Sequence, residues 1–152
     1  MTALQDNLAK LDGYLARFGE TGIRNRIAGR DMNGSGSVFQ TLSPVDESVI
    51  CDVARGTAAD IAAAAQAANA AFDDWRDLPA KERRATLIRI AEGIEARAEE
   101  IALCECWDTG QAIKFMSKAA LRGAENFRYF ADQVVQARDG QHLKSPTLMN
   151  IT

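Results

Sequence analysis

The chain has 152 residues, of which 47% are hydrophobic, so we expect one folded domain with a core that is thin because much of this fraction is alanine. Its 18 basic and 21 acidic residues give a net charge of −3, which offers no electrostatic attraction for nucleic acid or for an anionic membrane. No apolar run approaches the roughly 20 residues of a membrane span, and the first residues do not have the pattern of a secretory signal.

The first segment, residues 2–18, has the periodicity of an amphipathic helix. Its apolar residues recur at steps of three and four, which places them on one stripe: Leu4, Leu8, Leu11, Leu15 and Phe18. Gly19 is expected to end this helix. Because the polar face carries only Lys10 and Arg17 as cations, docking onto a core is favoured over binding to a membrane surface.

A β region is expected next. Three segments have the composition of short strands: residues 25–28, 37–42 and 49–53. Two turn-rich segments, residues 30–36 and 43–48, join them, which indicates a small antiparallel meander. The tract Gly34-Ser35-Gly36 does not fit a phosphate loop, because a strand follows it and no helix offers its amino end to a phosphate.

Helical periodicity dominates the rest of the chain. Residues 57–76 predict a helix in which Thr57 and Asp60 resemble a capping box. Its expected buried face consists of Ile61, Ala65, Ala68, Phe72 and Trp75. Pro79 opens a second helix, which continues until Asp108-Thr109-Gly110 breaks it. A last helix is expected over residues 114–138, with an inward face of Met116, Ala119, Gly123, Phe127, Phe130 and Val134.

The predicted fold class is α+β and mainly helical. It comprises an N-terminal helix, a small antiparallel β meander, three to four α-helices and a projecting C-terminal strand within residues 147–152. We expect that strand to have no pairing partner within the chain and His142 to lie in a solvated loop.

The cysteines are the first residues to consider for chemistry. Their odd number does not suggest a disulfide framework, and reduced thiols are expected. The Cys104-Glu105-Cys106 motif is a poor metal site, because zinc needs about four ligands and the only histidine is His142. No Gly-X-Ser-X-Gly motif is present, and the carboxylates of residues 82–100 alternate with basic residues as on a solvated helix face. The residues alone therefore predict a soluble domain without its own active site.

Six segments in order resemble the aldehyde dehydrogenase superfamily. Residues 27–30, Ile-Ala-Gly-Arg, resemble the opening I-G-G-x motif, and residues 43–50, Ser-Pro-Val-Asp-Glu-Ser-Val-Ile, resemble the N-P-A-T-G-E-V-I turn. Residues Asp60 to Trp75 resemble D-V-x-x-A-V-x-A-A-x-x-A-F-x-x-W, and Pro79 with Glu82-Arg83 resembles P-x-x-E-R. Asp108 to Gln111 resemble the D-T-G-K turn, and Asn126 to Ala131 resemble the R-Y-Y-A helix. The resemblance covers residues 23–152, and residues 125–132 are most similar to dehydrogenases of 5-carboxymethyl-2-hydroxymuconate semialdehyde, from aromatic-acid breakdown.

The resemblance implies the amino-terminal portion of an enzyme that oxidises an aldehyde to a carboxylate with NAD or NADP. Residues 1–140 would belong to the cofactor-binding domain, with 1–22 as an extra helix, and residues 141–152 would begin an oligomerisation strand. The family's nucleophilic cysteine, activating glutamate, oxyanion-hole asparagine and Rossmann residues all lie after the matched segment. The chain alone is therefore expected to be inactive and to bind no cofactor, whereas the parent would be a cytoplasmic homo-oligomer, a dimer or tetramer.

Two candidate sites follow from the resemblance. Some members hold a monovalent cation with main-chain oxygens around the N-P and D-T-G turns, here Thr41, Leu42 and Asp108, although a dry backbone contact is an equal alternative. The helix after D-T-G lines the substrate entrance in relatives, which points to Ala119 and Gly123, with Arg122 nearby. Arg122 would either meet a carboxylate-bearing aldehyde or be solvated.

Two further hypotheses stay open. The chain could be a non-catalytic α+β binding or assembly module derived from this family. Alternatively, it could be a small helical regulator whose likeness to dehydrogenases is accidental.

Overall fold

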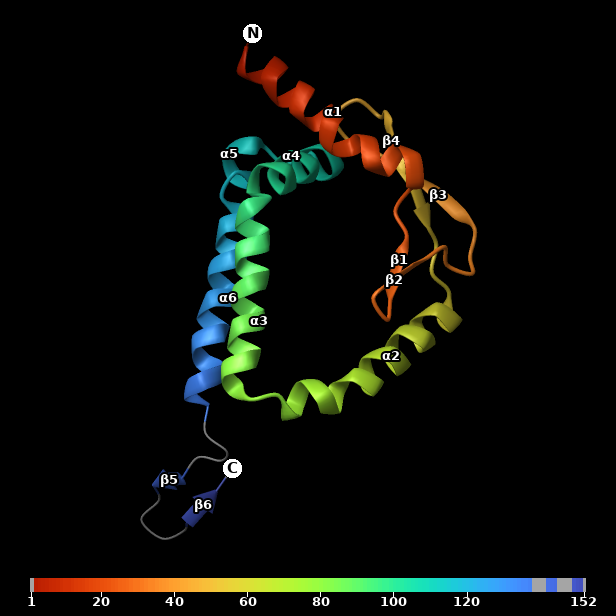
Figure 1. The fold of residues 1–152 in the computed structure, drawn as a ribbon. Helices are drawn as coiled ribbons and strands as arrows, with labels where there is room; N and C mark the ends of the chain where they lie inside the picture. Colours follow the sequence, from red (N-terminus) through yellow and green to blue (C-terminus); the bar gives the residue numbers. More distant parts are fainter. Residues whose placement is uncertain (1, 138–141, 145–148, 152) are drawn as a thin grey trace.

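The computed structural model describes residues 2–137 and the backbone of residues 142–144 and 149–151. The elements follow one another around an open ring (Figure 1). Helices α3 (Ala80–Ala96) and α6 (Ala119–Gln136) run side by side on one flank, and two β-hairpins lie on the other. Helices α1 (Ala3–Thr21) and α4 (Ala98–Thr109) join the flanks at one end of the ring, and α2 (Ala58–Asp77) joins them at the other.

Helix α1 begins at a capping box and ends later than predicted. Thr2 caps the first turn, since the Thr2 N–H donates to the side chain of Gln5 and the Gln5 N–H donates to the Thr2 hydroxyl. The predicted end at Gly19 is wrong, because the helix continues to Thr21 and stops at Gly22, where φ is 65°. The turn belongs at Gly22 because the next residue pairs with β4: the Ile23 N–H donates to the Asp52 carbonyl over 2.8 Å.

The predicted meander is two separate antiparallel hairpins. Strand β1 (Asn25–Ile27) pairs with β2 (Arg30–Met32), and β3 (Val38–Leu42) pairs with β4 (Val49–Ala54). The sequence predicts a turn at residues 30–36, but the chain already reverses at Ala28 and Gly29, where φ is 51° and 74°. Two consecutive residues with positive φ make the tight hairpin connection that fits the twist of the strands. A parallel bridge between Ile23 and Val53 lies outside these strands.

Two residues other than glycine have positive φ in the described part of the chain, Ala28 and Glu47 (φ 62°). Both stand where the aldehyde dehydrogenase motifs have glycine, in I-G-G-x and in N-P-A-T-G-E-V-I respectively. The left-handed region costs a residue with a Cβ about 1–2 kcal/mol. The chain therefore keeps the backbone of both turns and carries the strain of a side chain in each.

Replacing Glu47 with glycine is expected to stabilise the chain by about 0.5–1 kcal/mol, because relief of the positive φ outweighs the greater freedom of glycine in the unfolded state. Thermal unfolding followed by circular dichroism measures the change, and Glu47→Ala is the control because it removes the charge but keeps the Cβ. An equal gain in both variants would attribute the effect to the carboxylate and contradict the backbone explanation.

Helix α2 is capped as expected but does not bury its apolar face. The Thr57 N–H donates to Asp60 Oδ2 over 2.7 Å, as in the predicted capping box. However, no residue of α2 is buried, and Ile61, Phe72 and Trp75 are 70%, 55% and 40% exposed. Helical periodicity identifies the apolar face, but the described chain supplies little beyond β1 to cover it.

The helix predicted to run from Pro79 to the Asp108 turn is two helices, α3 and α4. They meet at Arg97, which has φ −116° and ψ 19° and closes a tight turn with its N–H donating to the Ile94 carbonyl. The local sequence Ala96-Arg97-Ala98 contains no helix breaker. We therefore attribute the break to contacts that residues 97–100 make with other elements, such as the ion pair between Glu100 and Arg17 of α1.

The last predicted helix is also interrupted. A single turn, α5 (Ile113–Met116), precedes α6. Met116 is buried as predicted, but Phe130 is 60% exposed, and the face of α6 that packs on α3 contains smaller residues: Ala120, Ala124 and Ala131. The predicted stop at Asp139-Gly140 lies outside the described residues.

The expectation that the C-terminal strand has no partner in the chain is wrong. Strand β5 (His142–Lys144) pairs antiparallel with β6 (Met149–Ile151), and this hairpin lies beyond the end of α6 (Figure 1). His142, expected in a solvated loop, is instead the first residue of β5 and pairs with Ile151. Residues 145–148 and 152, also part of the tail, lie outside the described residues.

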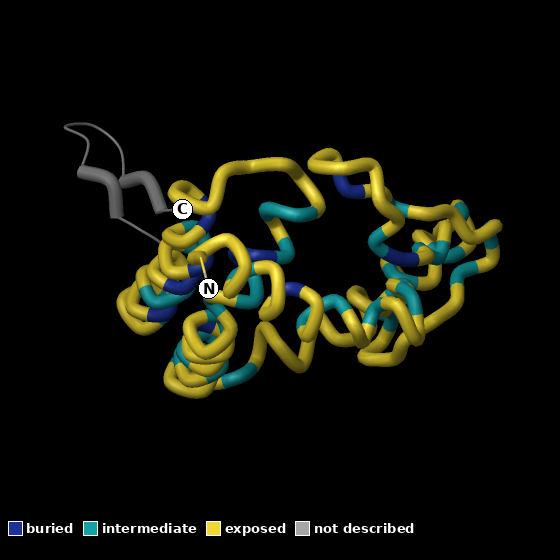
Figure 2. The backbone as a smooth tube through the Cα atoms, turned by 90° about the horizontal axis from the view of Figure 1, so that it is seen from above, coloured by how far each residue is buried: buried dark blue, intermediate teal, exposed yellow. Residues whose placement is uncertain are grey.

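The core is thin, as the alanine content predicts. Buried residues occur in short stretches around the ring, and most of the described residues are exposed (Figure 2). Among the described residues nine hydrophobic ones are buried, and five of these are alanine, a residue that buries little apolar area. The nine are Leu11, Cys51, Ala91, Ala102, Leu103, Met116, Ala120, Ala124 and Ala131. Within residues that the structure describes, no helix has the length and apolarity that a membrane crossing requires.

Candidate functional site

The two turns singled out by the family resemblance contact each other. Gly110 ends α4 in the left-handed conformation with φ 73°, and a Cβ added there would lie 3.1 Å from Cγ of Pro44. Ser43 is 1% exposed, its N–H donates to the Ser48 carbonyl, and its hydroxyl accepts from the Val45 N–H. Burial and these hydrogen bonds hold the Ser43-Pro44 turn in place beside Gly110, which brings the D-T-G turn close to strand β3.

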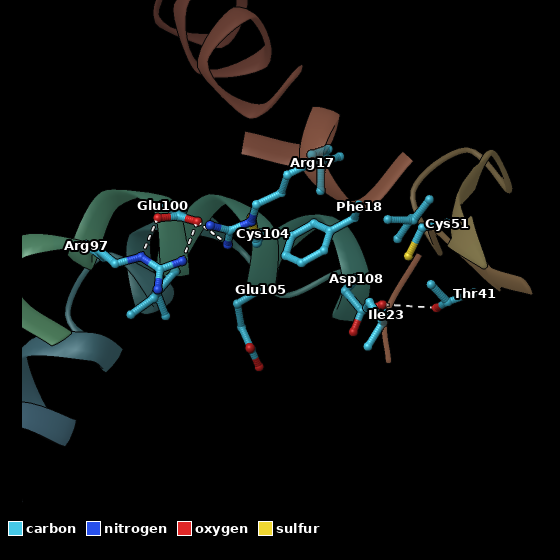
Figure 3. A pocket seen from close by; sticks show the side chains of 13 residues that line it. Arg17, Phe18, Ile23, Thr41, Cys51, Arg97, Glu100, Cys104, Glu105 and Asp108 are labelled. Carbon is cyan, nitrogen blue, oxygen red and sulfur yellow. Dashed lines mark hydrogen bonds and ion pairs between the residues drawn. The ribbon is translucent and has the colours of Figure 1, made fainter. Parts of the chain in front are cut away.

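Two of the three residues predicted to surround a cation are in contact. The Thr41 hydroxyl, on β3, donates to Asp108 Oδ1 at the end of α4 over 3.1 Å (Figure 3). Leu42 is the next residue of β3, at an irregularity in its register with β4, and is 51% exposed. No group of three or more His, Cys, Asp or Glu side chains suited to a metal ion occurs among the described residues.

Thr41 and Asp108 line one end of a cavity of about 280 Å³ between α1, α4 and the β3–β4 hairpin. Apolar side chains, including Phe18, form much of its wall (Figure 3). At the other end Glu100 is paired with Arg17 of α1 and accepts two hydrogen bonds from Arg97, over 2.7 and 2.8 Å. Hydrogen bonding to Arg97 lowers the pKa of the Glu100 carboxyl, so Glu100 is ionised and ties α1 to the junction of α3 and α4.

The cysteines have the properties of packed residues. Cys51 is buried, Cys104 and Cys106 are half-buried, and all three are free thiols. Burial raises the pKa of each thiol, and neighbouring carboxylates, such as Glu100 beside Cys104, raise it further. Because the thiolate is the reactive form, a raised pKa argues against a nucleophilic role for any of the three.

Of the three residues predicted at the substrate entrance, only Arg122 lines a depression on the surface. Arg122 is exposed and lines a surface depression at the start of α6, whereas Ala119 and Gly123 are half-buried and are not among the residues that line it. Lys114 and Lys118, which the sequence analysis did not single out, line this depression with Arg122. The spacing of four residues between positions 114, 118 and 122 could have indicated that these three cations lie on one side of a helix.

Comparison with known proteins agrees with this arrangement of turns and helices. The model of the aldehyde dehydrogenase family matches residues 32–152. An aldehyde dehydrogenase of Vibrio cholerae is 38% identical over 128 residues, which cover 82% of this chain and 25% of that protein. An EPTC-inducible aldehyde dehydrogenase of Rhodococcus erythropolis is 41% identical over 106 residues, 69% of this chain and 21% of that protein.

Solved structures show the same fold. HpcC from Thermus thermophilus superposes with a TM-score of 0.82 at 32% identity, over 90% of this chain and 27% of that protein. PnpE, solved in complex with nicotinamide adenine dinucleotide, superposes with a TM-score of 0.75 at 32% identity, over 85% and 27%. The chain belongs to the aldehyde dehydrogenase family and corresponds to the amino-terminal portion of its fold. It spans about a quarter of the length of these relatives.

Proposed function

We propose that the chain is the amino-terminal part of an NAD(P)-dependent aldehyde dehydrogenase that oxidises an aldehyde to a carboxylate, and that it is inactive alone. The observation that carries this proposal is the family match over residues 32–152, in a chain where burial raises the pKa of each of the three cysteine thiols. The nicotinamide would accept the hydride in the complete enzyme, and we assign no residue of this chain to hold it. A semialdehyde from aromatic catabolism is the proposed substrate type, on the likeness of residues 125–132.

The proposed role of the described residues is structural support for the cofactor-binding domain. Residues 1–22 would be an extra helix of that domain, and residues 141–152 would begin the oligomerisation strand of a cytoplasmic dimer or tetramer. The exposed apolar residues of α2 support this role, since Ile61, Phe72 and Trp75 lie on one side of the helix by spacing. A continuous apolar face of this kind requires a partner, which the remainder of such an enzyme would supply.

The isolated chain is expected to show no reduction of NAD+ or NADP+ with any of a panel of aldehydes, measured by the absorbance of the reduced nicotinamide. A longer protein that joins this chain to the later segments of the family should turn over, because it would contain the nucleophile, the base and the cofactor site. Turnover by the isolated chain that is lost on Cys104→Ser would refute the proposal. An inactive longer protein would instead favour the non-catalytic binding or assembly module.

Thr41, Leu42 and Asp108 are proposed to lie around a monovalent cation, with main-chain oxygens as ligands. The Thr41–Asp108 hydrogen bond supports this only by bringing the two turns together. If a cation binds, the melting temperature of the chain should be higher in potassium chloride or sodium chloride than in choline chloride at the same concentration. Equal melting temperatures in the three salts would favour the alternative, a dry contact between the turns.

A further inference from the structure

The loop between β2 and β3 contains the only asparagine of the chain that is followed by glycine, Asn33. Asn33 is exposed, and its side chain forms no hydrogen bond with a described residue. In the same part of the structure the Gly34 N–H donates to no protein group, whereas the next two N–H groups, of Ser35 and Gly36, are both bonded. The side-chain amide of Asn33 and the main-chain nitrogen of Gly34 are therefore adjacent and unengaged.

An asparagine in this position can lose its side-chain amide without an enzyme. The Gly34 nitrogen attacks Cγ of Asn33 and closes a succinimide ring, and the side-chain nitrogen leaves as ammonia with the proton of the Gly34 N–H. Glycine favours this attack because it has no Cβ to crowd its nitrogen. Water then opens the ring, at Cγ to give aspartate or at the main-chain carbonyl carbon to give isoaspartate. The net reaction consumes water, releases ammonia and needs no oxidant or reductant.

The residues after Gly34 fasten this loop to the start of α2. The N–H and the hydroxyl of Ser35 both donate to Asp60 Oδ2, over 3.1 and 2.7 Å. The Ser35 hydroxyl also lies 2.6 Å from the hydroxyl of Thr57, the N-cap residue of α2. The Gly36 N–H donates to the Arg55 carbonyl over 3.1 Å. The position of the loop and the capping of α2 therefore depend on the same hydrogen bonds.

Gly34 has no room for a longer main chain. Its φ is 70°, and a Cβ there would lie 2.7 Å from the Arg55 carbonyl oxygen and 2.9 Å from Asn25 Nδ2. Isoaspartate adds a methylene to the main chain directly before Gly34, whereas aspartate keeps the main-chain length and adds only a charge. Because the backbone of Gly34 is packed on both sides, the additional length must displace Ser35, and the hydrogen bonds of Ser35 to the start of α2 are lost.

We propose that Asn33 is a site of spontaneous deamidation, and that its isoaspartate product releases the start of α2 from the loop of residues 33–36. Helix α2 has no buried residue and, within the described structure, meets little besides β1, so it has few other contacts to hold its first turn. This helix joins the two flanks of the ring at one end (Figure 1), and its release loosens that end. The modification does not depend on the proposed function.

The first test is peptide mapping by mass spectrometry while the 152-residue chain is kept at mildly alkaline pH and physiological temperature. Asn33 should convert at least about tenfold faster than Asn126, which is inside α6, where the following N–H is bonded within the helix. Its rate should also lie within about tenfold of that of a synthetic peptide of residues 30–37, because both reacting groups are free in the folded chain. Digestion with a protease that cleaves before aspartate but not before isoaspartate separates the two products.

The second test is hydrogen exchange at residues 61–64, the first amides of α2 that are bonded within the helix, beginning with Ile61 to the Thr57 carbonyl. The purified isoaspartate form should exchange about three- to tenfold faster there than the fresh chain, the effect of losing one or two hydrogen bonds. Fresh Asn33→Asp, which adds the charge without the methylene, should exchange like the unmodified chain. Asn33→Gln should show no change on ageing, because its longer side chain forms the ring far more slowly. Asn69→Gln, on the exposed surface of α2, is the matched control and should age like the unsubstituted chain.

Three results would overturn the proposal. Conversion of Asn33 no faster than that of Asn126, or far slower than in the peptide, would show that the fold protects the loop. An isoaspartate form with unchanged exchange at residues 61–64 would show that the loop does not hold the start of α2. Equally fast exchange in fresh Asn33→Asp would attribute the effect to the new charge and contradict the role of the main-chain length.

Discussion

Replacing Ala124 with leucine is expected to destabilise the chain by about 2–3 kcal/mol, with a fall in melting temperature of roughly 5–10 °C. Ala124 has no exposed surface, and it lies on the helix pair with Ala91 of α3, which is also fully buried. The close approach of α3 and α6 depends on these small side chains. The additional heavy atoms of leucine at position 124 have no space there, so the helices must separate or leucine must adopt a strained rotamer.

The matched control is Gln133→Leu, which adds a leucine to the exposed surface of the same helix. It should change stability by no more than about 0.5 kcal/mol. Thermal and urea unfolding followed by circular dichroism measure both variants. Equal losses in the two variants, or a neutral Ala124→Leu, would show that the α3–α6 contact is looser than described.

Replacing Gly22 with alanine is expected to cost about 2–3 kcal/mol, from two additive causes. The φ of 65° alone costs a residue with a Cβ about 1–2 kcal/mol. In addition, the new Cβ would lie 2.8 Å from the Asp52 carbonyl oxygen, which accepts the hydrogen bond of the Ile23 N–H. Strand β4 must then move away from the end of α1, and cleavage by trypsin after Arg24 should become faster.

Gly13→Ala is the control for this prediction, because Gly13 is inside α1 and a Cβ there would meet no atom within 4 Å. It should stabilise the chain by up to about 1 kcal/mol through helix propensity. The two glycine-to-alanine changes should therefore shift the melting temperature in opposite directions. A shift in the same direction would contradict the account of how α1 ends.

Short-range chemistry in the sequence was sufficient for several features. Side chains close in sequence make the Thr57–Asp60 cap of α2, and the left-handed glycine that ends α4 follows directly from Asp108-Thr109-Gly110. The family and its amino-terminal extent followed from the order of six motifs, which depends on residue identity and spacing alone. Lys114 and Lys118 could have been found by the same spacing argument, because they lie eight and four residues before Arg122.

Only the tertiary structure decided where helices break and which apolar faces are covered. No residue within Ala96-Arg97-Ala98 is a helix breaker, yet the backbone of Arg97 is not helical. At this point Glu100 forms ion pairs with Arg97 and with Arg17 of α1, which is distant in sequence. The periodicity of α2 located its apolar face, but burial requires a second surface, which the described residues do not supply for Ile61 and Phe72. Propensity and periodicity act over a few residues, whereas burial and helix breaks depend on side chains that meet across long distances in sequence.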